Sequence, residues 1–310
     1  MTKKIGFDIG YSTVKVITPD GEYKSEEAVI AINPADNTVV ACGREAVALN
    51  IRVPGSVKLI HPFSGEMTPD VSYVYAYFSY MLDNLKIKNC RALISFSGAH
   101  DDETENAYVK GIQNAGIGTV SVIDPVYAAA QGCTTDGISN SAVINIGASV
   151  TDMGCFFMGQ SVAQRSNSFA GNAFDRAVMN AVMNKYRYKM TSKEAEKAKL
   201  QLLSLTRYEG RTVECDAIKA PYGLPKKLTL NESDIKDGCE AVFDNLCDEI
   251  IGMIRALKVE PDKIILTGGT ASLDGLKEAL SFLLLLPIEV CEEPQYAVIR
   301  GIKNILDKMK

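Results

Sequence analysis

The sequence predicts an α/β fold that is built twice along one chain. Along the whole chain, segments in which apolar residues recur every second position, as in strands, alternate with segments in which they recur at helical spacing. A strand, a glycine-containing turn and a second strand appear at residues 5–17 and again at residues 142–158. This is a repeat of pattern, which is a weaker signal than a repeat of sequence, but it indicates two similar halves.

The first half is expected to open with antiparallel strands. Residues 5–17 predict two strands joined by a tight turn at Gly10, and residues 22–32 continue in the same style. Residues 70–85 carry apolar and aromatic side chains at helical spacing after the start signal Thr68-Pro69-Asp70. The remaining elements of this half are a strand at 91–96, a helix at 101–115, a strand at 119–123 and a helix from 126 that ends near Gly132.

A polar break at residues 134–141 precedes the second half, which opens with the strand, turn and strand of residues 142–158. Helices are then expected at 173–186, 192–205, 233–257, 273–282 and 296–309, and strands at 211–219, 226–230, 263–267 and 288–291. No low-complexity segment or flexible linker interrupts this order.

The composition is that of a soluble globular protein, with 46% hydrophobic and 23% charged residues among 310. A net charge of -5 argues against a broad nucleic-acid-binding face. Asp8 comes before any apolar run long enough for a secretory signal, and the apolar run at 282–288 is too short to cross a bilayer. We therefore expect a cytoplasmic protein with no nucleic-acid partner.

The eight cysteines are scattered singly, mostly in apolar runs, and no Cys-x-x-Cys pair occurs. This pattern predicts reduced, buried, structural thiols. The chain has only two histidines, His61 and His100, which argues against a histidine-based metal centre. The cysteines are Cys42, Cys90, Cys133, Cys155, Cys215, Cys239, Cys247 and Cys291.

Three glycine turns carry the chemistry, at residues 8–13, 145–152 and 266–272. A glycine lets the backbone turn sharply, so that successive N–H groups face one concavity and hold phosphate oxygens. Asp8 in the first turn is suited to hold the water shell of Mg²⁺. The paired glycines of the third turn allow a flat ligand to lie close to the backbone. Each turn alone is an ordinary connection, but their order and spacing indicate a nucleotide site.

The three turns resemble the two phosphate loops and the adenosine motif of the actin and sugar-kinase superfamily. Residues 123–130 and 294–301 are similar to its two connecting segments. Within the superfamily the chain resembles the bacterial MreB family best. Residues 42–46 and 54–67 resemble the small first subdomain of that family. Residues 168–175 resemble its loop over the nucleotide, and residues 223–230 its Gly-Leu-Pro-Lys segment. The resemblance covers nearly the whole chain in register.

The resemblance implies an actin-like fold of two duplicated RNase H-like domains with a nucleotide cleft between them, each with a small inserted subdomain. Domain I would comprise residues 1–141 plus 296–310, with its small subdomain at about 34–60. Domain II would comprise residues 142–295, with its small subdomain at about 181–245.

The resemblance also implies roles for individual residues. One phosphate face would be held by Asp8, Gly10, Tyr11, Ser12 and Thr13, and the other by Gly147, Ala148 and Ser149. Mg²⁺ would be held by Asp8 and, through water, by Asn145. Gly171 would approach the phosphates or sugar, Glu196 and Lys199 would reach the ribose and base, and Gly268, Gly269, Thr270 and Ala271 would line the adenine.

Asp124 falls where the family places the glutamate that orients the attacking water, and it is the candidate catalytic residue. On the residues alone two alternatives stay open. Asp124 before Pro125 could be only a turn residue or a cap. Glu196 and Lys199 could be a solvated pair one helical turn apart, which without the resemblance is the preferred interpretation.

The second turn departs from the family pattern Asp-Ile-Gly-Gly-Gly-Thr-Thr-Glu. Asn145 removes a negative charge near the metal, and Val150 lacks a hydroxyl. Ala148 and Ser149 place Cβ atoms where glycine allows the closest approach. Asp124 is one methylene shorter than glutamate, and catalytic geometry is sensitive to errors of about 1 Å. We expect binding of ATP, ADP and Mg²⁺, with slow hydrolysis of ATP to ADP and phosphate if hydrolysis is retained.

The function implied is that of an ATP-binding, MreB-like protein that forms nucleotide-dependent cytoskeletal filaments, in cell shape or intracellular organisation. The chain itself is then the main partner, and cytoskeletal or membrane-protein adaptors stay open as others. Proteins of the family commonly carry an apolar, membrane-touching loop where this chain has a short polar stretch between Leu82 and Arg91, which argues against direct membrane binding. The alternatives are a non-polymerising scaffold with a degraded ATPase, an ATP-dependent chaperone or reactivating factor, and a small-molecule kinase.

Overall fold

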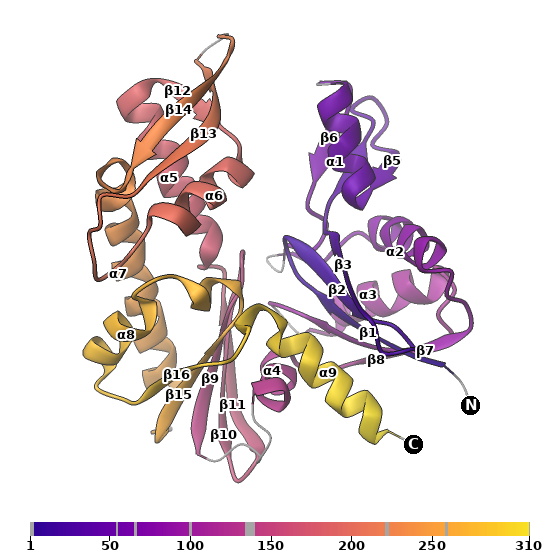
Figure 1. The fold of residues 1–310 in the computed structure, drawn as a ribbon. Coiled ribbons are helices and arrows are strands. Elements are labelled where there is room, and N and C mark those ends of the chain that lie inside the picture. Colours follow the sequence, from indigo (N-terminus) through magenta and orange to yellow (C-terminus); the bar gives the residue numbers. More distant parts are fainter. Residues whose placement is uncertain are drawn as a thin grey trace.

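Two five-stranded sheets with the same strand order form the two halves of the molecule (Figure 1). The computed structural model describes residues 3–53, 55–64, 67–98, 101–133, 140–220, 223–257 and 260–309. The first sheet has the order β3 (Tyr23–Glu27), β2 (Thr13–Ile17), β1 (Lys3–Ile9), β7 (Cys90–Phe96) and β8 (Thr119–Val122). The second has the order β11 (Gln160–Asn167), β10 (Thr151–Phe157), β9 (Ser141–Ile146), β15 (Lys263–Thr267) and β16 (Ile288–Val290).

The pairing pattern is also the same in the two sheets. In each, the first three strands pair antiparallel and the last three pair parallel. The parallel strands are joined by helical crossovers, as a parallel pair requires. The expected α/β fold with a duplicated start is therefore confirmed.

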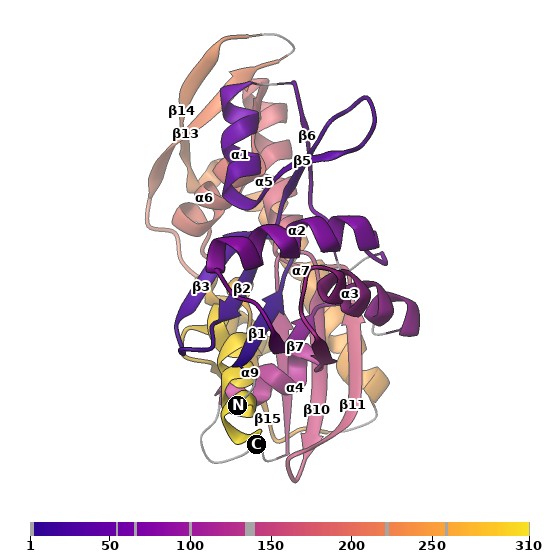
Figure 2. The ribbon, with the colours of Figure 1, turned by 90° about the vertical axis from the view of Figure 1, so that its right-hand side faces the viewer.

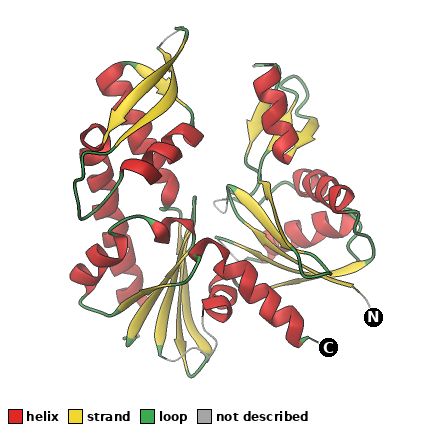
Figure 3. Ribbon diagram, viewed as in Figure 1, coloured by secondary structure: helices red, strands yellow, loops and turns green. Residues whose placement is uncertain are grey.

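Helices cover the outer side of each large sheet (Figure 3). In the first half these are α2 (Val71–Leu85) and α3 (Asp102–Asn114). The carboxylate of Asp70 caps α2 by accepting from the Ser72 N–H at 2.7 Å, as the start signal predicts. Tyr77 and Phe78 are fully buried in the core between α2 and the sheet, whereas Tyr75 is exposed. In the second half the helices are α7 (Glu232–Leu257) and α8 (Leu276–Leu284), and α5 (Gly171–Tyr186) packs against α7.

Each half also carries a small three-stranded sheet with a helix. In the first half, β5 (Val39–Cys42), β4 (Ile30–Ile32) and β6 (Lys58–Ile60) pack with α1 (Gly43–Arg52). In the second half, β12 (Tyr188–Met190), β13 (Thr212–Lys219) and β14 (Pro225–Asn231) pack with α6 (Ser192–Leu202). These units stand at the same end of the molecule, facing each other (Figures 1 and 2).

Two helices connect the halves, α4 (Pro125–Cys133) and α9 (Ala297–Lys308), and they lie between the large sheets (Figure 1). They pack with their backbones in contact. A Cβ atom added to Gly301 would lie 1.7 Å from the Ala128 carbonyl oxygen, and one added to Gly132 would lie 2.0 Å from that of Ala297. Glycine is required at both positions, because a side chain would drive the helices apart. We refer to this crossing of α4 and α9, which joins the halves, as the hinge.

Several elements are absent from the sequence prediction, namely α1, β5, β6, β11 and β12. β11 is mostly exposed and polar, so it shows no alternation of buried and exposed side chains. The predicted helix at 273–282 begins three residues later, at Leu276, after the 3-10 helix η1 (Gly269–Ser272). A second 3-10 helix, η2 (Pro294–Tyr296), precedes α9. His100 and most of the polar break, residues 134–139, lie outside the described residues.

All eight cysteines are free thiols, and all except the half-buried Cys133 are buried, as predicted. Within the described ranges, no helix combines the length and apolar character needed to cross a membrane.

Candidate functional site

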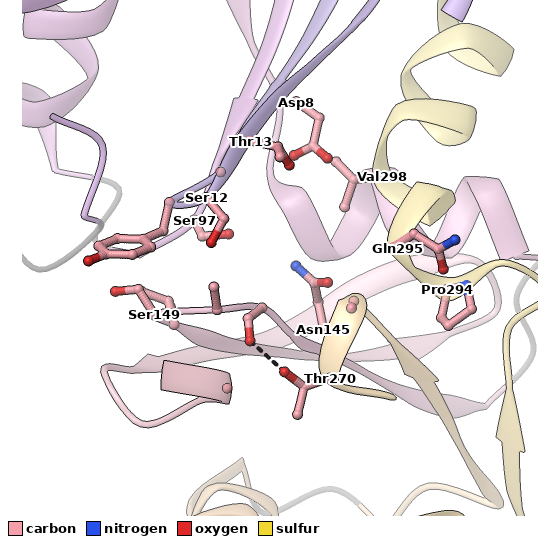
Figure 4. A pocket seen from close by; sticks show the side chains of 18 of the residues that line it. Asp8, Ser12, Thr13, Ser97, Asn145, Ser149, Thr270, Pro294, Gln295 and Val298 are labelled. Carbon is pink, nitrogen blue, oxygen red and sulfur yellow. Dashed lines mark hydrogen bonds between the residues drawn. The ribbon is translucent and has the colours of Figure 1, made fainter. Parts of the chain in front are cut away.

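A cleft of about 500 Å³ lies between the two halves. In Figure 4, Asp8, Ser12, Thr13 and Ser97 of the first half face Asn145, Ser149 and Thr270 of the second. All three predicted glycine turns contribute to the walls. The predicted residues that line the cleft are Asp8, Gly10, Tyr11, Ser12, Thr13, Asn145, Gly147, Ala148, Ser149, Gly171, Glu196, Lys199, Gly268, Gly269 and Thr270.

The first two turns are each closed by an equivalent backbone hydrogen bond. The N–H of Gly10 donates to the carbonyl of Thr13 at 3.1 Å, and the N–H of Gly147 donates to that of Val150 at 3.0 Å. A Cβ atom added to Gly10 would lie 3.0 Å from the Thr13 carbonyl oxygen, and one added to Gly147 would lie 3.0 Å from that of Val150. The two halves therefore present equivalent tight turns to opposite sides of one cleft.

Asp8 in the first turn is paired with a lysine that sequence reasoning missed. The Nζ of Lys15 lies 2.9 Å from a carboxylate oxygen of Asp8, and both side chains are largely buried. The pair forms because the two residues are directly opposite each other in the β1–β2 register. That register follows from the turn, so the predicted hairpin could have identified Lys15. It brings a positive charge to the cleft wall.

The second turn is held by two neighbouring segments. The Gly171 N–H and the Thr270 hydroxyl both donate to the Gly147 carbonyl, at 3.1 Å and 2.8 Å. The Thr270 bond is the dashed line in Figure 4. Gly171 must be glycine here, since its Cβ atom would lie 2.5 Å from the Thr270 hydroxyl oxygen. The Ser149 hydroxyl donates to the Ser64 carbonyl of the other half at 2.6 Å, so this turn also bridges the cleft.

Lys199 and Glu196 both line the cleft, but their environments differ. The Nζ of Lys199 lies 2.8 Å from a carboxylate oxygen of Asp175, and both of these side chains are buried. Burial raises the pKa of Asp175, and the charge of Lys199 opposes that shift. Glu196 is exposed. Lys199 is thus paired with Asp175, and Asp175 is a cleft residue that the prediction did not assign.

The third turn contains two glycines with different constraints. Gly268 has a φ of +85° and a ψ of 162°, and its Cβ atom would lie 2.3 Å from the Ile146 carbonyl oxygen. Gly269 has open space around the position of its Cβ atom. Ala271, which the prediction placed against adenine, is only 3% exposed and packs in the core of the second half. It does not line the cleft.

Asp124 does not line the cleft either. Its carboxylate accepts from the Tyr127 N–H at 2.8 Å, which is the helix cap that the residues alone left open. Its role as the residue that orients water stays a prediction. Nearby, Asp152 is fully buried and accepts from the Gly98 N–H at 3.2 Å and the Ser166 hydroxyl at 2.6 Å. Burial raises the pKa of Asp152 to about 6.

Other cleft residues were not assigned to the site, although Pro294 and Gln295 fall in the predicted connecting segment 294–301. Ser97 follows β7, and Gln295 with Pro294 belongs to η2. They reach the cleft because parallel strands end at the same edge of a sheet. Sequence reasoning missed Lys15, Ser25, Phe63, Ser64, Ser97, Asp175, Leu200, Ser272, Leu273, Pro294, Gln295, Tyr296 and Val298 as site residues.

The described part of the chain holds no group of three or more His, Cys, Asp or Glu side chains arranged to bind a metal ion. Asp8 and Asn145 are the oxygen donors at the ends of the equivalent strands β1 and β9, and both line the cleft. This donor set fits Mg²⁺ that keeps most of its waters and is held mainly by a ligand's phosphates.

Comparison with known proteins gives a match over the whole chain. The family model described as "MreB/Mbl protein" matches residues 2–310. The cell shape-determining protein Mbl of Bacillus subtilis is 25% identical, covering 99% of this chain and 96% of its own. The cell shape-determining protein MreB of Escherichia coli K12 is also 25% identical, covering 96% of this chain and 91% of its own.

Solved structures share the fold. MreB5 of Spiroplasma citri bound to ADP superposes with a TM-score of 0.87 at 21% identity, covering 98% of this chain and 96% of its own. The MamK double helical filament superposes with a TM-score of 0.79 at 17% identity, covering 99% of both chains. The expected actin-like two-domain fold is thereby confirmed.

Proposed function

The chain belongs to the MreB/Mbl family, and on that premise we propose that it binds ATP in the cleft and assembles into filaments that take part in determining cell shape. The observation that carries the proposal is the pair of equivalent turns at Gly10 and Gly147, which face each other across one cleft. A ligand with a phosphate chain can engage both turns only when the halves are held together. Binding and closure are therefore coupled.

The residues divide between the parts of the nucleotide. The backbone N–H groups and hydroxyls of residues 10–13 and 147–149 are suited to phosphate oxygens, and Lys15 adds the positive charge that a triphosphate needs. Gly269 leaves open space for a flat base. Exposed Glu196 is suited to the ribose hydroxyls. Asp8 and Asn145 would hold Mg²⁺ through water, and the ion would neutralise phosphate charge.

Hydrolysis of ATP is expected to be slow. Asn145 supplies no negative charge to the metal, Val150 has no hydroxyl, and one oxygen of the Asp124 carboxylate accepts from the Tyr127 N–H. Orientation of an attacking water needs a group within hydrogen-bond reach of it. A slow reaction would still time disassembly, because it changes the ligand that holds the halves together.

Assembly follows from closure when contact surfaces lie on both halves, since these surfaces align only in the closed state. A contact between different faces of successive subunits is heterologous and continues into a filament. The solved MamK double helical filament supports this use of the fold. We place the protein in the cytoplasm, with cytoskeletal or membrane-protein adaptors as its further partners.

Sedimentation and electron microscopy with Mg-ATP, Mg-ADP and no nucleotide test the proposal. We expect filaments with ATP or a slowly hydrolysed analogue. Asp8→Ala should reduce them strongly, whereas Asp248→Ala, the same change at an exposed position on α7, should not. Calorimetric titration of ATP into the same proteins separates loss of binding from loss of assembly.

A monomeric mass by light scattering with saturating Mg-ATP would reject the filament. If ATP still binds, the result supports the second candidate, a non-polymerising actin-like scaffold. Asn145 and the capping role of Asp124 favour that candidate, because both weaken the link between nucleotide state and hydrolysis.

A further inference from the structure

Two of the eight thiols meet at the hinge between the halves. Cys133 is the last residue of α4, and Cys291 directly follows β16. The two side chains are hydrogen-bonded to each other. They are 158 residues apart in sequence, and the fold alone brings them together. A disulfide has an S–S length of about 2.05 Å, so thiols in hydrogen-bond contact need only a small movement to form one.

An arginine from the second connecting helix completes the cluster. The Nη2 of Arg300 donates to the sulfur of Cys291 at 3.2 Å, and its Nε donates to the Gly132 carbonyl at 3.1 Å. The same guanidinium also donates to the Glu292 carbonyl and lies 3.8 Å from the Glu293 carboxylate. Arg300 therefore links the end of α4, the segment after β16 and α9.

The two thiols differ in their tendency to ionise. The hydrogen bond with Cys133 and the charge of Arg300, whose Nη2 lies 3.2 Å from the Cys291 sulfur, lower the pKa of Cys291, against the effects of burial and of Glu292. The same hydrogen bond and burial raise the pKa of Cys133. Burial raises the pKa of the six remaining thiols, to about 12 for Cys42, Cys239 and Cys247. A thiolate is the reactive form of cysteine, so the chemistry is concentrated at Cys291.

A disulfide between Cys133 and Cys291 would connect segments that join the two halves. Gly132, next to Cys133, packs against the backbone of α9 at Ala297 and Gly301. Three residues after Cys291, Pro294 lines the cleft and its carbonyl accepts from the Gly268 N–H at 2.9 Å. A link between Cys133 and Cys291 would thus join the hinge helix α4 to the segment that supports the third turn.

We propose that Cys133 and Cys291 are a reversible oxidation site for hydroperoxides, whose disulfide restrains the hinge between the halves. The Cys291 thiolate attacks the peroxide O–O bond, takes one oxygen as a sulfenic acid and releases hydroxide or alkoxide. The Cys133 sulfur then attacks the Cys291 sulfur, and the sulfenic oxygen leaves as water. Two thiols and one peroxide give one disulfide, one water and one water or alcohol. A dithiol reductant reverses the reaction.

Peptide mapping tests the bond directly. The full-length protein is treated with hydrogen peroxide, its remaining thiols are alkylated, and it is cut before aspartates. This digestion places Cys133 in residues 124–135 and Cys291 in residues 274–306, apart from Cys155. We expect one linked peptide, lost on reduction, as the main oxidation product. Two separate alkylated peptides from oxidised wild-type protein would overturn the proposal without any variant.

Variants identify the order of the steps. In Cys133→Ser the sulfenic acid at Cys291 has no thiol to meet, so dimedone should label residues 274–306. In Cys291→Ser neither the link nor the label should form. Cys90→Ser, which removes another buried thiol, should leave the link unchanged. Equal dimedone labelling of Cys291→Ser and Cys133→Ser would contradict the assignment of Cys291 as the reacting thiol.

The effect on the hinge is measured through the function proposed above, on which this part rests. Oxidised wild-type protein should give several-fold less ATP-dependent sediment than reduced protein, and reduction should restore it, whereas Cys90→Ser should behave like wild type. If the disulfide-linked protein sediments with ATP as well as the reduced protein does, the disulfide does not restrain the hinge. If reduced protein does not sediment at all, the filament proposal fails. The hinge restraint is then tested by ATP affinity, which should fall on oxidation, and unchanged affinity would overturn it.

Discussion

Asp8 and Lys15 form an ion pair of 2.9 Å across directly opposed positions of β1 and β2, at the wall of the cleft. The equivalent positions in the second half are Asn145 and Asp152, which also oppose each other across β9 and β10. One half therefore places a positive charge beside its turn, and the other half buries an acidic group there. The two halves share the same strand pairing but differ in the charged groups beside their turns.

Lys15→Ala should weaken ATP binding by about ten- to a hundredfold, because a charged donor near the phosphates is lost and Asp8 is left unpaired. Adenosine carries no phosphate, so its affinity should change little. Calorimetric titration of both ligands measures the difference, with Lys24→Ala at an exposed position as the control. An equal loss for ATP and adenosine would place Lys15 outside the phosphate site.

Gly269→Val should abolish adenine-nucleotide binding while the protein stays folded, because its side chain enters open space in the cleft. Gly118→Val, also at a position with open space but away from the cleft, is the matched control. Gly268→Val should instead destabilise the fold, by about 1–3 kcal/mol from its backbone conformation alone, with a clash in addition. Thermal unfolding and titration of all three separate the outcomes. Unchanged ATP affinity in folded Gly269→Val would remove this turn from the site.

Lys199→Met should lower the free energy of unfolding by about 3–5 kcal/mol, because it leaves the buried Asp175 without its partner. Glu196→Gln, at an exposed position on the same helix, should leave stability unchanged and weaken nucleotide binding. Urea denaturation and titration of both variants check this division. A stable Lys199→Met protein that has lost only ATP affinity would show that Lys199 is free to bind the ligand.

Asp152 should make the protein less stable as the pH rises. Its pKa is 3.8 in the unfolded chain and about 6 in the folded one, so the folded state favours the protonated form. The contribution of Asp152 to the free energy of unfolding is fully present below pH 3.8 and is lost as the pH rises through about 6. The loss is about 3 kcal/mol. Asp152→Asn should therefore be more stable than wild type at pH 7.5 by up to that amount, and about equal to it near pH 4. Urea denaturation at the two pH values measures this.

The same site constrains any repair of the second turn. Asn145→Asp would place a second carboxylate opposite Asp152, which should raise the pKa of Asp152 further and lower stability at neutral pH. Asn145→Asp combined with Asp152→Asn should recover the loss. Additive effects in this double-mutant cycle would show that the two side chains do not interact.

Much of the fold could be predicted from the sequence because it rests on local signals. The alternation at residues 5–17 and 142–158 predicts both hairpins, and Asp70 with the apolar spacing after it predicts α2. Elements without such a signal were missed. β11 is exposed and polar, and it is a strand only because β10 offers it a free edge. Short elements such as β12 are likewise held by their neighbours in the sheet.

For the site, the three glycine turns could be predicted from the sequence, because glycine after a strand is a local turn signal. Their surroundings depend on how the two halves pack. The tertiary structure pairs Lys199 with Asp175 instead of leaving it free, uses Asp124 as a helix cap, and moves Ala271 into the core. It also brings Cys133 to Cys291. Apart from the local Asp124 cap, these contacts join residues far apart in the chain. No local pattern records them, because burial and partners are set by the packing of the two halves.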